Sequence, residues 1–186
     1  FSSVEIDVTD LDRTSILYYI EILYRLGYDE IKLKFSNPQA EHYRLNKKEN
    51  VISIIHYVAS RLISMEVIQQ KDNFAILKNL EEISNKEFDT VLKRIFILLQ
   101  DASDDFLSGI KKGDLIALET IVEKHDSIAK FISYGMRIVN KKGSGDKRNS
   151  KLLFHILNQL DKVTDILKYS ARELIDNKRT LSKDAY

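Results

Sequence analysis

The spacing of the hydrophobic residues changes near residue 83, and this change constrains the fold more than any other feature of the chain. Beyond it, apolar residues recur at steps of three and four along 84–112, 114–141 and 151–176, which is typical of amphipathic helices that pack in a bundle. The connections between these segments are short, at Gly113 and at "KKGSGDKRN". Short connections favour antiparallel neighbours, so residues 83–178 are predicted to form an antiparallel three-helix bundle.

The residues that face the centre of this predicted bundle follow from the same spacing. Ser84 and Glu87 form a capping box at the start of its first helix. The inward residues are Phe88, Leu92, Ile95, Leu99, Ala102 and Phe106 in the first helix, Leu118, Ile121, His125, Ile128, Ile132 and Val139 in the second, and Leu153, Leu157, Leu160, Thr164, Leu167, Ala171 and Leu174 in the third.

Residues 1–82 carry a mixture of helical and strand patterns. Apolar and polar residues alternate over 4–8 and 28–35, as in half-buried strands. A helix is predicted from a cap at Thr9 or Asp10 to Gly27, and a second over 51–63. The runs "MEVIQQ" and "FAILKNL" predict a hairpin that turns at Asp72 and Asn73, and the proline-containing stretch 36–50 is predicted to be a polar loop.

The order β-α-β-α-β-β predicts a small α+β domain in which helices cover one face of the sheet. The predicted fold class is therefore an α+β N-terminal domain over residues 1–82, followed by the all-α antiparallel bundle over 83–178 and a flexible tail over 179–186. The chain is expected to be predominantly helical.

Charge and cysteine content exclude several classes of protein. The chain has 29 basic and 28 acidic residues, a net charge of +1 and no cysteine. A balanced charge argues against a general nucleic-acid binder. The lack of cysteine excludes disulfides and thiolate metal sites, and it fits a reducing cytoplasm. No apolar run approaches the roughly 20 residues that cross a bilayer, so no transmembrane segment is predicted.

Two aspartates in the third predicted helix are the main chemical feature. Asp161 and Asp165 lie one helical turn apart in "LDKVTDILKY". In an antiparallel hairpin Asp165 lies about level with residue 127, and two residues along a helix span about 3 Å. His125 and Asp126 are therefore predicted to lie within one turn of Asp165. These carboxylates and the imidazole suit a divalent or iron ion, so we predict a metal site of Asp161, Asp165, His125 and Asp126.

A second interpretation of these residues needs no metal. Asp161, Asp165, Lys168 and Arg172 form a ridge beside the seam, where ion pairs between residues three and four apart are common. A lone histidine at a seam position is commonly a core residue. The sequence has no HExxH pair, no calcium loop and no recognisable order of nucleophile, base and acid, so no catalytic residue is predicted.

Several stretches resemble archaeal members of the PhoU family of phosphate-uptake regulators, in the same order along almost the whole chain. These stretches are "LYRLGYDEIKL", "ISIIHYVASRLISMEVIQQKDNFAILKNL", "EFDTVLKRIFILLQDASDDFLSGI", "IVEKHDSIAKF" and "LDKVTDILKY". The resemblance implies a three-helix PhoU repeat, which can carry metal through Glu/Asp-x-x-x-Asp motifs. Asp161 and Asp165 match that motif, whereas the second helix has His125 and Ala129 where the family usually has acidic residues.

The resemblance also implies a function. We expect a non-enzymatic cytoplasmic regulator of phosphate uptake and homeostasis that binds a transporter or a signalling protein as a homodimer, assisted by a metal ion. The alternative is the effector or dimerisation half of an AbrB-type transcription regulator, which would contact DNA only through a domain preceding Phe1. Two further hypotheses are a metalloprotein for ion storage or redox chemistry, and a structural dimer without a ligand.

Overall fold

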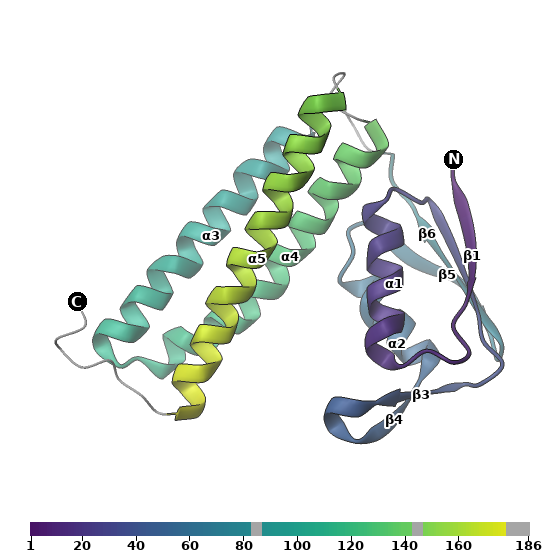
Figure 1. Ribbon diagram of the computed structural model, residues 1–186, viewed down its shortest axis with the longest axis horizontal. Coiled ribbons are helices and arrows are strands. Elements are labelled where there is room, and N and C mark those ends of the chain that lie inside the picture. The colour runs from purple at the N-terminus through teal and green to yellow at the C-terminus, as the bar shows by residue number, and fades with distance from the viewer. Residues whose placement is uncertain (83–86, 143–146, 178–186) are drawn as a thin grey trace. The chain divides into compact units, whose positions relative to one another are not determined.

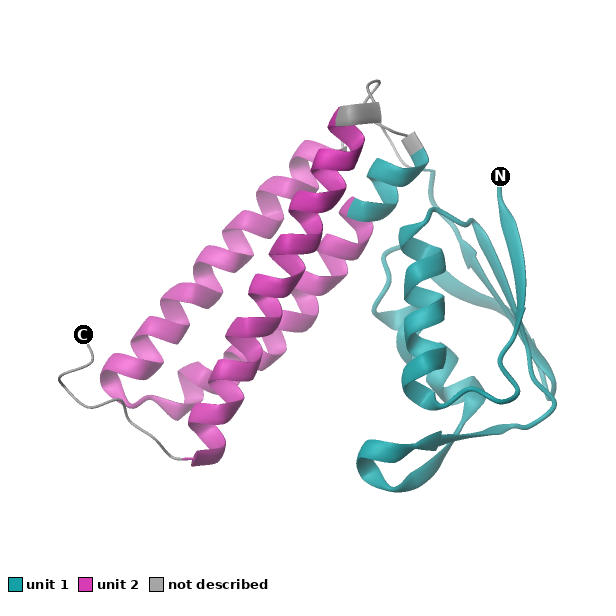
Figure 2. Ribbon diagram, viewed as in Figure 1, with its two compact units in different colours: residues 1–85, 136–143 teal, residues 86–135, 144–186 magenta. Residues whose placement is uncertain are grey.

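The computed structural model describes residues 1–82, 87–142 and 147–177, and it divides into two compact units (Figure 2). The first unit comprises residues 1–85 together with 136–143, and the second comprises 86–135 with 144–186. A small α/β region is thus followed by three long helices. The sequence-based division places residues 136–143 in the helical part, whereas in the structure they complete the α/β unit.

The first unit is built on a four-stranded sheet. Its strands lie in the order β1 (Ser3–Asp7), β2 (Glu30–Lys34), β6 (Phe74–Asn79) and β5 (Met65–Lys71) (Figure 1). β1 and β2 are parallel and the other pairs are antiparallel. Ile31 and Leu33 of β2 pair with Leu77 and Ala75 of β6, and all four are buried. The alternation predicted from the sequence therefore gives one apolar face, which packs against the helices.

Two helices cover this sheet, and their ends follow from local side-chain chemistry. α1 (Arg13–Arg25) is capped by Asp12, whose carboxylate accepts a hydrogen bond from the Ser15 amide at 2.9 Å. The predicted cap at Thr9 or Asp10 is wrong, because Thr9 instead donates its amide and its hydroxyl to Asp7. α1 ends before Gly27, as predicted, and Gly27 has a φ of +96°.

The predicted polar loop over 36–50 is also wrong, because it contains a second, two-stranded sheet. β3 (Gln39–His42) and β4 (Lys47–Asn50) are antiparallel strands joined by a short 3-10 turn, η1 (Tyr43–Leu45). Their side chains are mostly charged and exposed, and only Ala40 is fully buried. The hairpin is held by backbone pairing rather than by an apolar face, so it leaves no alternation in the sequence. α2 (Val51–Ser60) follows directly. The predicted β5–β6 hairpin, which turns at Asp72 and Asn73, is confirmed.

The second unit contains the long helices α3 (Glu87–Lys112), α4 (Leu115–Lys142) and α5 (Lys147–Asn177), of which α4 also runs into the first unit. Every predicted inward residue of α4 is buried: Leu118, Ile121, His125, Ile128, Ile132 and Val139. On α5, Leu157, Thr164 and Ala171 are buried. The helical spacing therefore identified the packed faces of these two helices correctly. The predicted cap at Ser84 and the tail at 179–186 lie outside the described residues.

None of the helices described in the structure combines the length and the apolar character that crossing a membrane requires.

Candidate functional site

His125 of α4 lies between two carboxylates. Its Nε2 atom is 2.9 Å from Oδ1 of Asp165 on α5, and its Nδ1 atom is 3.0 Å from Oδ1 of the neighbouring Asp126. The side chain of His125 is 11% exposed. The sequence predicted that these three residues come together, and the structure confirms this. The prediction worked because the register of two antiparallel helices is fixed by the length of their connection.

Lys168 is the fourth member of this cluster, which we call the His125 cluster (His125, Asp126, Asp165 and Lys168). Its Nζ atom lies 2.7 Å from Oδ1 of Asp165 and 2.9 Å from Nε2 of His125. Burial alone would raise the pKa of Asp165, but the hydrogen bonds from Lys168 and His125 and their charges outweigh burial and lower that pKa. Asp165 is therefore an ionised partner of Lys168, as the interpretation without metal predicts.

The donor atoms of the His125 cluster do not fit a metal ion as they stand. Asp165 faces Nε2 of His125, whereas Asp126 faces Nδ1 on the other side of the ring, so the two carboxylates cannot share one ion with the imidazole. The ammonium of Lys168 contacts both remaining donors. Across residues 1–82, 87–142 and 147–177, no group of three or more His, Cys, Asp or Glu side chains could hold a metal.

The metal site stays a prediction, and the structure adds two conditions to it. A bound ion would need Lys168 to move away, and Asp126 would then orient the imidazole through Nδ1 rather than bind the ion. Asp161, the fourth predicted ligand, lies half-buried one helical turn before Asp165 on α5.

A second polar cluster, in the first unit, was missed by the sequence analysis. Arg137 of α4 is completely buried. Its guanidinium donates to the carbonyl oxygens of Tyr24 at 3.1 Å and Tyr28 at 2.7 Å, and to Oδ1 of Asp29 at 3.0 Å. It also lies over the Tyr24 ring, 4.9 Å from the ring centroid. Arg137 therefore satisfies carbonyl groups at and just beyond the end of α1 while it pairs with a buried carboxylate.

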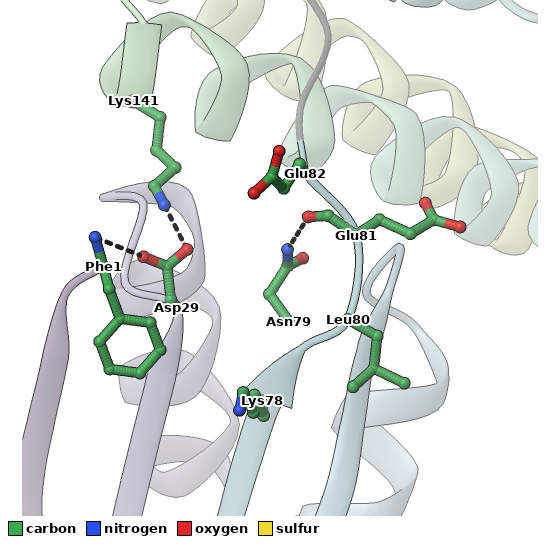
Figure 3. Close-up of a pocket in the computed structure, with 8 residues that line it drawn as sticks. All are labelled: Phe1, Asp29, Lys78, Asn79, Leu80, Glu81, Glu82 and Lys141. Atoms are coloured by element: carbon green, nitrogen blue, oxygen red, sulfur yellow. Dashed lines mark hydrogen bonds and ion pairs between the residues drawn. The ribbon is translucent and has the colours of Figure 1, made fainter.

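Asp29 receives further donors at the rim of a cavity of about 480 Å³. Lys141 reaches from α4 to its carboxylate, and the amide of Ser2 donates to it at 2.9 Å. Burial alone would raise the pKa of Asp29, but the hydrogen bonds from Lys141 and Ser2 and the charges of Lys141 and Arg137 lower it. In Figure 3 the cavity lies between the Asp29–Lys141 ion pair and the end of β6, where Asn79 donates to the Glu81 carbonyl.

The cavity is lined by groups of both charges, including Lys78, Lys141, Glu81 and Glu82. Such a lining does not select a ligand of either sign, and Asp29 is already neutralised by its cations. The sequence does contain a signal for the buried cluster. Arg137 interrupts the apolar run "ISYGMRIV" in the predicted second helix, and a cation in such a position needs a buried partner.

Comparison with known proteins yields one limited similarity. The chain is 26% identical over 124 residues to a "Putative cysteine ligase BshC" from Staphylococcus haemolyticus (strain JCSC1435). The aligned part covers 67% of this chain and 22% of that protein, so the chain spans about a fifth of the length of the relative it matches. No protein-family profile matches the chain. No solved structure matches it significantly.

Proposed function

We propose that this chain is a PhoU-like regulator of phosphate uptake that acts by binding other proteins in the cytoplasm, without catalysis of its own. The observation that supports this most strongly is the approach of α4 and α5 at His125 and Asp165. The PhoU resemblance implies that the second and third helices of its repeat bring their motif residues together, and these two residues occupy the corresponding positions.

The state of His125 supports a binding role rather than catalysis. Each of its ring nitrogens lies within hydrogen-bond distance of a carboxylate. A histidine that activates a nucleophile needs one nitrogen for the nucleophile and the other for an orienting group. With both nitrogens occupied by carboxylates, His125 instead links α4 to α5 and stiffens the surface that the two helices present.

The similarity to the putative cysteine ligase does not support a ligase function here. The matched region is about a fifth of that protein, and a fragment of that size does not define an active site. The alternative function, as the effector half of a DNA-binding regulator, stays a prediction. Reading the open reading frame upstream of Phe1 tests it directly.

Deleting the gene in its native host tests the proposed function. We expect the deletion strain to take up radiolabelled phosphate several-fold faster than the parent at high external phosphate, because the transporter has lost its regulator. Complementation with the wild-type gene should restore the parental rate. Sulfate uptake, measured in parallel, is the control and should not change. Identical phosphate uptake in the deletion strain and the parent would refute the proposal.

A second readout examines the surface itself. In a strain complemented with Asp165→Ala, His125 loses its carboxylate partner on α5 while the rest of the helical faces remains. We expect phosphate uptake between that of the parent and that of the deletion strain, with unchanged protein abundance on immunoblots.

A further inference from the structure

Helix α5 carries an exposed apolar stripe, which we call the α5 stripe and which consists of Leu152, Ile156, Val163 and Ile166 with Gln159 at its centre. The exposed fractions of the four apolar residues are 56%, 37%, 46% and 64% in that order. At about 100° per residue all five positions fall within about 80° of the helix circumference. They therefore form one continuous face along α5.

This stripe is additional to the face that α5 buries in its own unit. Leu157, Thr164 and Ala171 are buried on a neighbouring arc of the same helix. A helix at the surface of a domain typically needs an apolar arc of about 100° to cover a core. α5 presents roughly twice that width when both faces are counted, which indicates that the exposed half contacts something else.

We propose that the α5 stripe pairs with the same stripe of a second copy of this chain, with the two helices antiparallel. Leu152 and Ile166 lie seven residues on either side of Gln159, and Ile156 and Val163 lie three residues before it and four residues after it. An antiparallel pair centred on Gln159 places Leu152 opposite Ile166 of the second copy, and Ile156 within one residue, about 1.5 Å along the helix, of Val163 of the second copy. The positions recur at the three- and four-residue steps of a coiled-coil seam.

The chemistry of the stripe indicates a second copy rather than a different protein. The amide of Gln159 is both a donor and an acceptor, so two copies can satisfy each other at the symmetry axis. A single polar residue in an apolar seam also fixes the register of a helix pair. No charged side chain occupies the stripe between Leu152 and Ile166, so it offers nothing to select a partner of opposite charge.

The antiparallel direction follows from the end of the stripe. Seven residues beyond Ile166, which is two helical turns, the stripe position is taken by the exposed Glu173. In a parallel pair, Glu173 of one copy would face Glu173 of the second copy inside the seam. Like charges at that place disfavour association. In the antiparallel pair Glu173 lies beyond the paired segment, and the opposed helix dipoles add a small attraction.

Cysteine crosslinking of the full chain tests this pairing cleanly, because the chain contains no cysteine of its own. Leu152→Cys and Ile166→Cys are made as separate variants and mixed under mild oxidation. We expect a disulfide-linked dimer in the mixture, and little of it in Leu152→Cys alone. The two Leu152 positions would be about 21 Å apart in the antiparallel pair, far beyond the reach of a disulfide. Gln159→Cys should crosslink with itself.

Mass measurement provides the second arm, with a matched control. By light scattering at tens of micromolar, the wild type should have twice the 21.6 kDa mass of the chain. Ile166→Glu should reduce the mass to that of one chain at unchanged helical circular dichroism. Ile116→Glu, at an isoleucine of α4 that is 74% exposed, should remain a dimer.

Three results would overturn the proposal. A monomeric wild type would mean that the rest of the chain or another protein covers the α5 stripe. Equal masses for Ile166→Glu and Ile116→Glu would place the dimer interface elsewhere. Efficient self-crosslinking of Leu152→Cys, with none in the mixed sample beyond that level, would establish a parallel pair.

Discussion

At the scale of single residues, Arg137 has the most deeply buried charged side chain among the residues that the structure describes. Its side chain is completely buried, and it donates hydrogen bonds to Tyr24, Tyr28 and Asp29. A buried cation costs desolvation energy, which such hydrogen bonds offset only while all of the partners are present. Removing either side of this arrangement should therefore cost more than an ordinary surface substitution.

We expect Arg137→Met to lower the free energy of unfolding by about 3 kcal/mol, because it leaves the Tyr28 carbonyl and part of the Asp29 carboxylate without their donor. Equilibrium unfolding in urea, followed by circular dichroism, measures this loss. Arg94→Met, at an exposed arginine of α3, is the control and should change the free energy by less than about 0.5 kcal/mol. Equal effects of the two substitutions would contradict the structural role of Arg137.

The lowered pKa of Asp29 predicts a specific dependence of stability on pH. A carboxyl group whose folded pKa lies below its unfolded value, here 3.8, stabilises the fold above that value and loses its contribution as the pH falls further. We expect the wild type to lose stability more steeply below pH 3.8 than Asp29→Asn does. Thermal melts of both proteins between pH 2.5 and 6 measure the difference, and parallel curves would contradict it.

Not all of these residues could have been found from the sequence. The contact between His125 and Asp165 was predictable, because both residues lie on helices of one hairpin. The rise per residue then gives the position of each residue along the helix axis. Arg137 meets Asp29 across 108 positions of sequence, and no periodic pattern links them. Lys168 was placed correctly on the ridge beside Asp165, but its contact with His125 depends on side-chain conformation, which spacing does not specify.

At the scale of elements, the pairing of α4 with α5 is where the metal hypothesis can be decided. The ammonium of Lys168 contacts both donors that face one another across the two helices, Nε2 of His125 and Oδ1 of Asp165. A divalent ion at that position would be repelled by the ammonium. We therefore expect Lys168 to weaken any binding of a metal ion between His125 and Asp165.

We expect Lys168→Met to bind Zn²⁺ at least about tenfold more tightly than the wild type, since removing one nearby positive charge is worth more than about 1.4 kcal/mol in a partly buried site. Isothermal titration calorimetry on protein freed of metal measures the difference. Adding Asp165→Asn to Lys168→Met should abolish the gain. Unchanged Zn²⁺ binding in Lys168→Met would remove the metal hypothesis for this cluster.

The end of α1 carries a second prediction at this scale. Gly27 has a φ of +96°, and a Cβ added there would lie 2.7 Å from Cγ of Lys141. Gly27→Ala combines backbone strain with displacement of Lys141 from Asp29, so we expect a loss of about 1–2 kcal/mol. The loss, measured by urea unfolding, should be smaller in a Lys141→Ala background, where Cγ is missing. An equal loss in both backgrounds would assign the whole effect to the backbone.

Elements with a strong period were predictable, and elements without one were not. The inward faces of α4 and α5 follow directly from steps of three and four, and the β5–β6 hairpin follows from its alternation and its Asp72–Asn73 turn. The β3–β4 hairpin escaped because its strands bury little more than Ala40. Where backbone hydrogen bonds rather than apolar contacts hold a pair of strands, the sequence shows no alternation of apolar and polar residues that would predict the pairing.

At the scale of the whole molecule, α4 is the element that belongs to both units. Residues 115–135 of this helix are part of the helical unit, whereas residues 136–142 are part of the α/β unit. Sequence spacing did not reveal this division, although the nearly continuous apolar run over 132–139, where every residue is buried, departs from the steps of three and four along the rest of α4. The boundary is set by tertiary partners such as Asp29, which the pattern within a helix does not identify.

A fragment experiment tests this division. We expect residues 1–85 alone to melt at least about 10 °C below a version in which residues 136–143 are attached through a flexible glycine–serine linker, because the attached segment restores Arg137 and Lys141 to Asp29. Circular dichroism melts compare the two proteins. The linked version with Arg137→Met is the control and should melt close to the bare fragment. Equal melting of the bare and linked fragments would contradict the division.

The composition of the first unit has a consequence for how such a protein can change over generations. A gene rearrangement that exchanged everything after residue 85 for another helical segment would also remove the eight residues that the α/β part requires. Only replacements that bring a compatible arginine and lysine with them would yield a stable product. The two halves should therefore be inherited together, even in lineages where their individual surfaces diverge.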